Sequence, residues 1–163
     1  YYGGFTQGFG YKNLDLQLFF TFSQGGKLLW GDHISSRQFN GTSNSHALML
    51  DRYHPGNTET NRERLVLEGN MPMPSSIDVY SSSYIKLRTL NMNYRFNQTR
   101  WMQRAGLQNT SVFLSATNLF TITKYPGNDP ETTNDTFSVG GGYFDVSNYP
   151  VVRTFSLGFK LGF

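Results

Sequence analysis

The sequence predicts an all-β chain whose antiparallel strands come from a transmembrane β-barrel. Three observations lead to this fold class. Aromatic residues make up 16% of the 163 residues and there are 17 glycines, a composition that favours strands and turns over helices. Apolar and polar residues alternate along several segments, as in strands with two different faces. The connections between these segments alternate between short and long, which is the layout of an outer-membrane barrel.

The first two predicted strands span residues 3–11 and 14–24, and the turn-forming pair Lys12–Asn13 joins them. The second strand shows the clearest alternation in the chain. Its apolar residues at every second position are Leu14, Leu16, Leu18, Phe20 and Phe22. Because successive side chains of a strand point to opposite faces, these residues share one face.

The third predicted strand spans residues 79–97, and its pattern changes parity partway. Apolar residues occupy odd positions up to Leu87 and even positions from Leu90 onward. A single inserted residue would bring both sets to the same face. We therefore expect a β-bulge near Arg88–Thr89.

The last two predicted strands span residues 110–124 and 149–163, which makes five strands in all. Two long connections separate the strands, at residues 25–78 and 125–148. They are rich in Gly, Ser, Asn and Pro, and we expect them to be the external loops of the barrel, with a short helix near residues 45–53. The short connections are expected on the periplasmic side.

The final strand has aromatic and leucine side chains at every second position, with small or polar residues between them. The apolar residues are Phe155, Leu157, Phe159 and Leu161. In a bilayer the outward face of a barrel strand must be apolar, whereas the lumen face can be polar. A soluble β-sandwich that binds carbohydrate is the alternative, because a half-buried sandwich strand shows the same alternation. A sandwich needs a second sheet over the apolar face, and a barrel leaves that face to lipid.

Composition argues against several classes of protein and site. The net charge of +3 without a dense Lys/Arg run gives no indication of nucleic-acid binding. The absence of Cys excludes disulfides and Cys-ligated zinc. The chain begins inside a strand-like pattern without an initiator Met or a signal peptide, so we expect its true start to lie upstream.

The polar residues of the long loops form no motif of an active site or cofactor site. The three histidines are spaced unlike a compact metal site, and a group of acidic residues follows no calcium-loop pattern. We therefore predict no catalytic, cofactor-binding or metal-binding residue and expect these side chains to be solvated. The residues concerned are His33, His46, His54, Asp129, Glu131 and Asp135.

Several aromatic residues also lie in the predicted loops. Their rings could stack on a ligand or contact a partner protein, or they could pack the loops together, and the second interpretation is favoured on sequence grounds. The residues are Trp30, Tyr53, Tyr125, Tyr143 and Phe144. Trp101 lies in a short connection and is expected to anchor the membrane interface.

The chain resembles a known family at several places. The segments "SVFLSATNLFTITKYPGNDPE" (111–131), "SSSYIKLRTLNMNYRF" (81–96) and "NYPVVRTFSLGFKLGF" (148–163) are similar to the C-terminal region of SusC/RagA-like TonB-dependent transporters of Bacteroidota. The alternate apolar residues ending in a final aromatic also resemble the assembly signal of bacterial outer-membrane proteins. The positions of that signal are Phe155, Leu157, Phe159, Leu161 and Phe163.

The resemblance implies a plugged barrel of about 22 strands in the bacterial outer membrane, of which this chain supplies the last five. It also implies import of a glycan or peptide, a SusD-like surface lipoprotein as partner, and energy delivered by TonB through a plug region that this chain lacks. Five strands cannot close a membrane barrel by themselves, since about eight are needed. The remaining barrel and plug are therefore expected partners, and no enzymatic activity is expected.

Overall fold

A computed structural model describes residues 1–37, 44–65, 73–131, 144–145 and 149–162. The chain divides into two compact units. The sheet unit comprises Tyr1–Gly25, Ser83–Lys124 and Val151–Phe163, and the loop unit comprises Gly26–Ser82 and Tyr125–Pro150. None of the helices in the described residues has the length and apolar character needed to cross a membrane.

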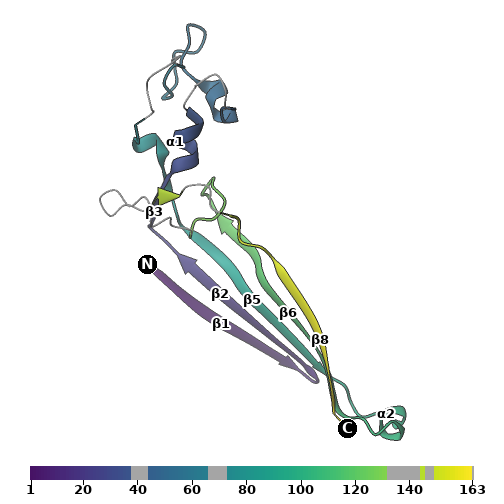
Figure 1. Cartoon of the computed structure of the whole chain (residues 1–163). Coiled ribbons are helices and arrows are strands. Elements are labelled where there is room, and N and C mark those ends of the chain that lie inside the picture. The colour runs from purple at the N-terminus through teal and green to yellow at the C-terminus, as the bar shows by residue number, and fades with distance from the viewer. Residues whose placement is uncertain (38–43, 66–72, 132–143, 146–148, 163) are drawn as a thin grey trace. The chain divides into compact units, whose positions relative to one another are not determined.

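The sheet unit is a five-stranded antiparallel sheet in the order β1-β2-β5-β6-β8 (Figure 1). Each strand pairs with the strand of this set that follows it in sequence. The strands are β1 (Tyr2–Tyr11), β2 (Leu14–Ser23), β5 (Tyr84–Arg95), β6 (Gln108–Thr123) and β8 (Thr154–Gly162). They contain 9 to 16 residues, whereas roughly 9–11 tilted residues cross a bilayer.

The short connections lie at one end of the sheet. Lys12 adopts a positive φ of 52° in the turn between β1 and β2, and the side chain of Asn13 donates to the Arg95 carbonyl at 2.7 Å. Residues 96–107, which include α2 (Arg100–Arg104), join β5 to β6 at the same end. The long connections leave from the opposite end, where Ser23, Tyr84 and Thr123 are paired.

The predicted β-bulge is confirmed. The register of β5 shifts between Leu87 and Thr89 against both neighbouring strands, so Arg88 is the inserted residue relative to β2. On β6 the same irregularity lies at Asn118, whose φ is 55°. The bulge keeps the apolar residues on one face along the full length of β5, because it offsets the change of parity.

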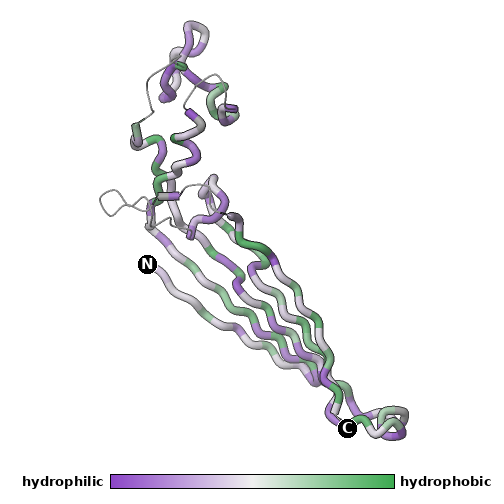
Figure 2. The backbone as a smooth tube through the Cα atoms, viewed as in Figure 1, coloured by the Kyte–Doolittle hydropathy of each residue, from purple (hydrophilic) through white to green (hydrophobic). Residues whose placement is uncertain are grey.

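Cross-strand register gives the sheet one apolar face, to which β1, β2, β5, β6 and β8 all contribute. A typical row runs through Phe9, Leu16, Met92, Leu114 and Leu157. Figure 2 shows the resulting alternation of hydrophobic and hydrophilic residues along each strand.

The apolar face is open to the surroundings. Phe155, Leu157 and Phe159 keep 65%, 65% and 68% of their surface exposed, so nothing in the described part of the chain covers them. A soluble sandwich would bury this face under a second sheet, and the described residues place no such sheet over it.

The loop unit has its own small sheet, in the order β4-β3-β7. Its core consists of Leu28, Trp30 and Tyr125, with Leu48 and Tyr80 packed against it. The elements are β3 (Lys27–Trp30), α1 (Gly31–Arg37), η1 (Ala47–Asp51), η2 (Ser76–Asp78), β4 (Val79–Ser81) and β7 (Phe144–Asp145). The short helix expected near residues 45–53 is thus a 3₁₀ helix, η1.

Two strand predictions are corrected by the structure. The segment predicted as one strand at 79–97 is two strands, since β4 pairs with β3 in the loop unit and β5 belongs to the sheet unit. The break lies at Ser82–Ser83, where Ser82 N–H donates to Gly26 O at 3.0 Å and Gly25 N–H donates to Ser83 Oγ at 3.1 Å. The final strand begins at Thr154 rather than residue 149, and Pro150 has no N–H to contribute to a ladder.

Candidate functional site

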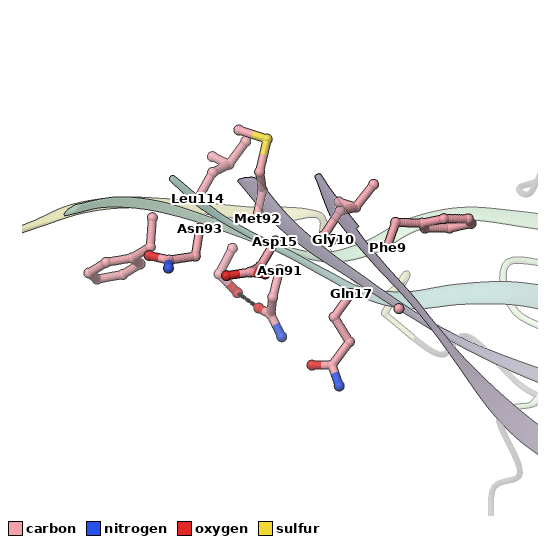
Figure 3. A pocket seen from close by; sticks show the side chains of 12 residues that line it. Phe9, Gly10, Asp15, Gln17, Asn91, Met92, Asn93 and Leu114 are labelled. Atoms are coloured by element: carbon pink, nitrogen blue, oxygen red, sulfur yellow. Dashed lines mark hydrogen bonds between the residues drawn. The ribbon is translucent and has the colours of Figure 1, made fainter. Parts of the chain in front are cut away.

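The polar face of the sheet contains an open hollow of about 610 Å³. Strands β1, β2, β5 and β6 line it, and Gly8 and Gly10 leave space on its β1 side. In Figure 3 the side chains of Asn91 and Gln17 point to one side of the sheet and those of Met92 and Leu114 point to the other. The polar lining residues are Asp15, Gln17, Asn91, Asn93 and Ser115.

Hydrogen bonds hold part of this polar lining in place. Ser115 Oγ donates to Asn91 Oδ1 at 2.8 Å, and Arg95 Nη2 donates to Asp15 Oδ2 at 2.8 Å. The remaining amides supply both donors and acceptors, which suits contact with peptide or sugar groups and with water. The lining has no nucleophile–base pair, so its chemistry is that of a hydrogen-bonding wall.

Two aromatic residues interrupt the polar face, and each ring lies over a glycine of a neighbouring strand. The Phe19 ring lies 3.1 Å from the position that a Cβ of Gly4 would take. Phe113 pairs with Gly158, and a Cβ at Gly158 would overlap the Phe113 ring. The glycines therefore give these rings room to lie flat along the sheet, an arrangement known to compensate for glycine in strands.

The predicted assembly residues lie where the alternation placed them. Phe155, Leu157, Phe159 and Leu161 are exposed on β8. Phe163 lies outside the described residues. A role of this strand in barrel assembly stays a prediction.

The predicted contact residues of the loops are not brought together on one surface. Trp30 and Tyr125 are buried, with ring centroids 6.5 Å apart, so for these two the packing interpretation holds. Tyr53 is 46% exposed. Tyr143 lies outside the described residues, and Phe144 is described only as part of β7.

The Tyr125 hydroxyl donates to Asp145 Oδ2 inside the loop unit. Burial, reinforced by the Asp145 carboxylate, raises the pKa of Tyr125 above its ordinary value. The phenol therefore stays protonated and serves as a structural hydrogen-bond donor to a buried carboxylate.

Two expectations of solvated side chains in the loops are wrong. Asp129 is only 5% exposed, because its Oδ1 accepts from the Glu131 N–H at 2.9 Å and closes a local turn. His33 is only 1% exposed. His46 and His54 are exposed as expected, whereas Asp135 lies outside the described residues.

His33 belongs to a buried charged cluster that sequence reasoning missed. Its Nδ1 lies 2.9 Å from Asp78 Oδ1, and its Nε2 lies 3.0 Å from Arg62 Nη1. Arg37 Nη2 donates to the other Asp78 oxygen at 2.8 Å. Arg37 lies four positions after His33 on α1, but Arg62 and Asp78 lie 29 and 45 positions after it. No local spacing therefore links His33 to Arg62 or Asp78. Among the described residues, no group of three or more His, Cys, Asp or Glu side chains is arranged to hold a metal ion.

The chain was compared with known proteins, and no family model matches it. It is 34% identical over 164 residues to TonB-dependent receptor P3 of Formosa agariphila and 30% identical over 166 residues to TonB-dependent receptor P26 of the same organism. The chain is homologous to SusC/RagA-like TonB-dependent receptors. TonB-dependent receptor SusC of Bacteroides thetaiotaomicron is 26% identical over 163 residues. These alignments cover 98% of this chain but only 15% to 16% of the relatives.

Solved structures agree with the relationship to SusC/RagA-like receptors. The RagAB peptide importer in its open-open state superposes with a TM-score of 0.76 at 26% identity, covering 99% of this chain and 17% of that chain. The RagAB peptide transporter superposes with a TM-score of 0.78 at 26% identity, covering 98% of this chain and 17% of that chain. The five-stranded sheet is thus part of an outer-membrane β-barrel, and its compartment is the bacterial outer membrane.

Proposed function

We propose that the chain forms part of the wall of a TonB-dependent importer that takes up nutrients across the outer membrane. The homologues are named as receptors and transporters, which supports a role in nutrient import and argues against enzymatic activity. Because the chain spans about a sixth of these relatives, the activity belongs to the whole protein of which this sheet is one part.

The observation that best supports this function is the pairing of an exposed apolar face with a polar one across the same strands. On the apolar side, Leu157 aligns with Leu114 and Met92; on the polar side, Ser156 aligns with Ser115 and Asn91. A membrane barrel needs this division, because its outer surface meets lipid and its inner surface meets water or a plug.

The two outer strands of the sheet, β1 and β8, support a larger barrel. In the sheet unit each of them pairs with one neighbour, which leaves the other edge of each strand for further pairing. An open edge is costly in lipid, where each unsatisfied backbone group costs several kcal/mol. We propose that the rest of the barrel closes against both edges and that this chain supplies five of its strands.

The loop unit is proposed to lie on the external side, where it contacts a SusD-like surface lipoprotein. Its strands and helices are formed by the long connections, which are external in barrels of this type. The imported substrate is proposed to be a glycan or a peptide, and TonB is proposed to act through a plug region outside this chain. The exposed ring of Tyr53 is a proposed contact for the partner or substrate.

Cysteine labelling tests the lipid-facing assignment, since this chain contains no Cys. In the intact receptor in outer membranes, we expect Leu157→Cys to react with a lipid-partitioning maleimide and to resist a charged, water-soluble one. Ser156→Cys is the matched control one residue away, on the other face, and should react with the charged, water-soluble maleimide. Equal labelling of both positions by the charged reagent would contradict the proposed wall.

A further inference from the structure

The loop unit contains a buried cluster of charged side chains in which one member can change its charge near neutral pH. His33 of α1, Asp78 of η2 and Arg37 of α1 are all nearly inaccessible, with exposures of 1%, 0% and 6%. Arg62 reaches this cluster from the loop that follows η1, with 15% of its side chain exposed. Histidine is the side chain whose charge changes most readily between pH 5 and pH 8.

The hydrogen-bond partners define the protonation state of His33. Arg62 carries only donors, so the Nε2 atom of His33, 3.0 Å from Arg62 Nη1, has to be the acceptor. The single ring proton then sits on Nδ1, which faces Asp78 Oδ1 at 2.9 Å. The folded cluster therefore contains the neutral imidazole with its proton on Nδ1.

A second proton on His33 would change only one end of the ring. Nδ1 carries a proton in both states, so its contact with Asp78 is kept or strengthened by protonation. Nε2 would change from acceptor to donor and would face the guanidinium of Arg62, donor against donor and cation against cation. The Arg62 contact cannot persist in that state.

We infer that His33 is a proton-sensitive latch that holds the segment 52–63 against α1 when neutral and releases it when protonated. Arg62 connects the latch to this segment, since its carbonyl accepts from Tyr53 N–H at 3.2 Å. Another link from the segment to α1 is the ion pair of Arg37 with Glu63 at 2.7 Å, and Glu63 is half exposed. Solvent screens this ion pair at Glu63, and the contact of Arg62 with His33 is the attachment that responds to the charge of the imidazole.

The surroundings of His33 set the direction of the response. Asp78 favours the protonated form, and the Trp30 ring, stacked on the imidazole at 5.4 Å, also suits a cation. Burial opposes protonation, as do Arg62 and Arg37. The Tyr80 ring also contacts the imidazole, in an edge-to-face arrangement. Burial is the largest of these effects, and the balance lowers the pKa of His33 below its ordinary value of 6.5.

The sign of the pH dependence follows from this shift. When segment 52–63 opens, His33 loses the Arg62 guanidinium and part of its burial but keeps Asp78 beside it, so its pKa rises from the lowered folded-state value and the open state binds the proton more readily. Opening is thus independent of pH well above the open-state pKa and becomes more favourable as pH falls from that value toward the lower folded-state pKa. With one proton linked, the opening equilibrium constant rises by up to about tenfold per pH unit in this window.

The physiological role of the latch rests on the proposed external position of the loop unit, because an external loop is exposed to the pH of the medium. Its test is independent of transport. Hydrogen–deuterium exchange of the intact receptor in detergent, corrected for intrinsic rates, is measured between pH 7.5 and pH 5. We expect protection of residues 52–63 to fall as the pH is lowered through this range, while 31–37 and 75–81, joined through Asp78, keep theirs.

Three variants separate the latch from other causes. His33→Gln should remove the pH dependence of residues 52–63. Arg62→Met should leave that segment open at pH 7.5 as well. This variant tests the Arg62 contact independently if the His33 variant does not fold. His54→Gln is the control, because His54 is an exposed histidine within the same segment, and the pH dependence should survive it. The latch would be overturned if the protection of residues 52–63 in the wild type did not depend on pH. It would also be overturned if His54→Gln abolished that dependence, or if Arg62→Met protected the segment as well as the wild type does at pH 7.5.

Discussion

At the scale of single residues, the pair of Phe113 and Gly158 shows how the polar face accommodates an aromatic ring. The two residues are direct cross-strand partners, and the Phe113 ring occupies the space that a side chain at position 158 would need. Gly8 lies on the same face of the sheet, and a Cβ there would meet no atom within 4 Å. A side chain would therefore fit at position 8 but would clash with the Phe113 ring at position 158.

We expect Gly158→Val to lower the stability of the folded barrel by about 1–3 kcal/mol, because the new side chain displaces the Phe113 ring. Urea unfolding of the intact receptor in detergent measures the change. Gly8→Val is the matched control and should have the smaller effect. Equal destabilisation by the two substitutions would show that lost glycine flexibility, and not the Phe113 ring, is responsible.

At the scale of elements, β8 presents the same division between faces in its simplest form. Leu157 is 65% exposed on the apolar side, and Ser156 is its neighbour on the polar side. Along β5 the same division survives a change of parity only because Arg88 is inserted as a bulge. Without that inserted residue, half of the strand would present its polar side chains to lipid.

Leu157→Arg should destabilise the inserted barrel by about 2–4 kcal/mol if this position lies near the bilayer midplane, since a charge on the lipid face loses its water. Ser156→Arg should be far milder, because its side chain faces the lumen. The measurement is the unfolding free energy of the receptor refolded into lipid vesicles. Equal costs for both substitutions would disprove the assignment of faces.

At the scale of the whole molecule, five strands with open edges require a larger barrel around them. Fractionation of source membranes with detergent extraction and mass analysis should find these 163 residues in the outer membrane, within or bound to a much larger polypeptide. A SusD-like lipoprotein is expected to co-purify. Recovery of the sequence as a free, soluble 18.6 kDa monomer would contradict the transporter assignment.

The sequence predicted the sheet well because strand faces are a local property. Period-two alternation in β2 and β8 needs no knowledge of the partner strand, and the change of parity between Leu87 and Leu90 was enough to place the bulge. In the sequence, Asn118 is a polar residue within the alternating apolar positions 112–122. Its role in the bulge, at a φ of 55°, depends on the pairing of β6 with β5.

The loop unit could not be predicted in the same way, because its contacts are not local. His33, Arg62 and Asp78 form their cluster through the folding of a long connection, and β3 pairs with β4 across a similar distance. The sequence by itself determined which side chains share the apolar face of the sheet and which share its polar face, since successive residues of a strand point to opposite faces. Only the tertiary structure decided that His33, Trp30 and Tyr125 are buried, since burial depends on which distant segments pack around a residue.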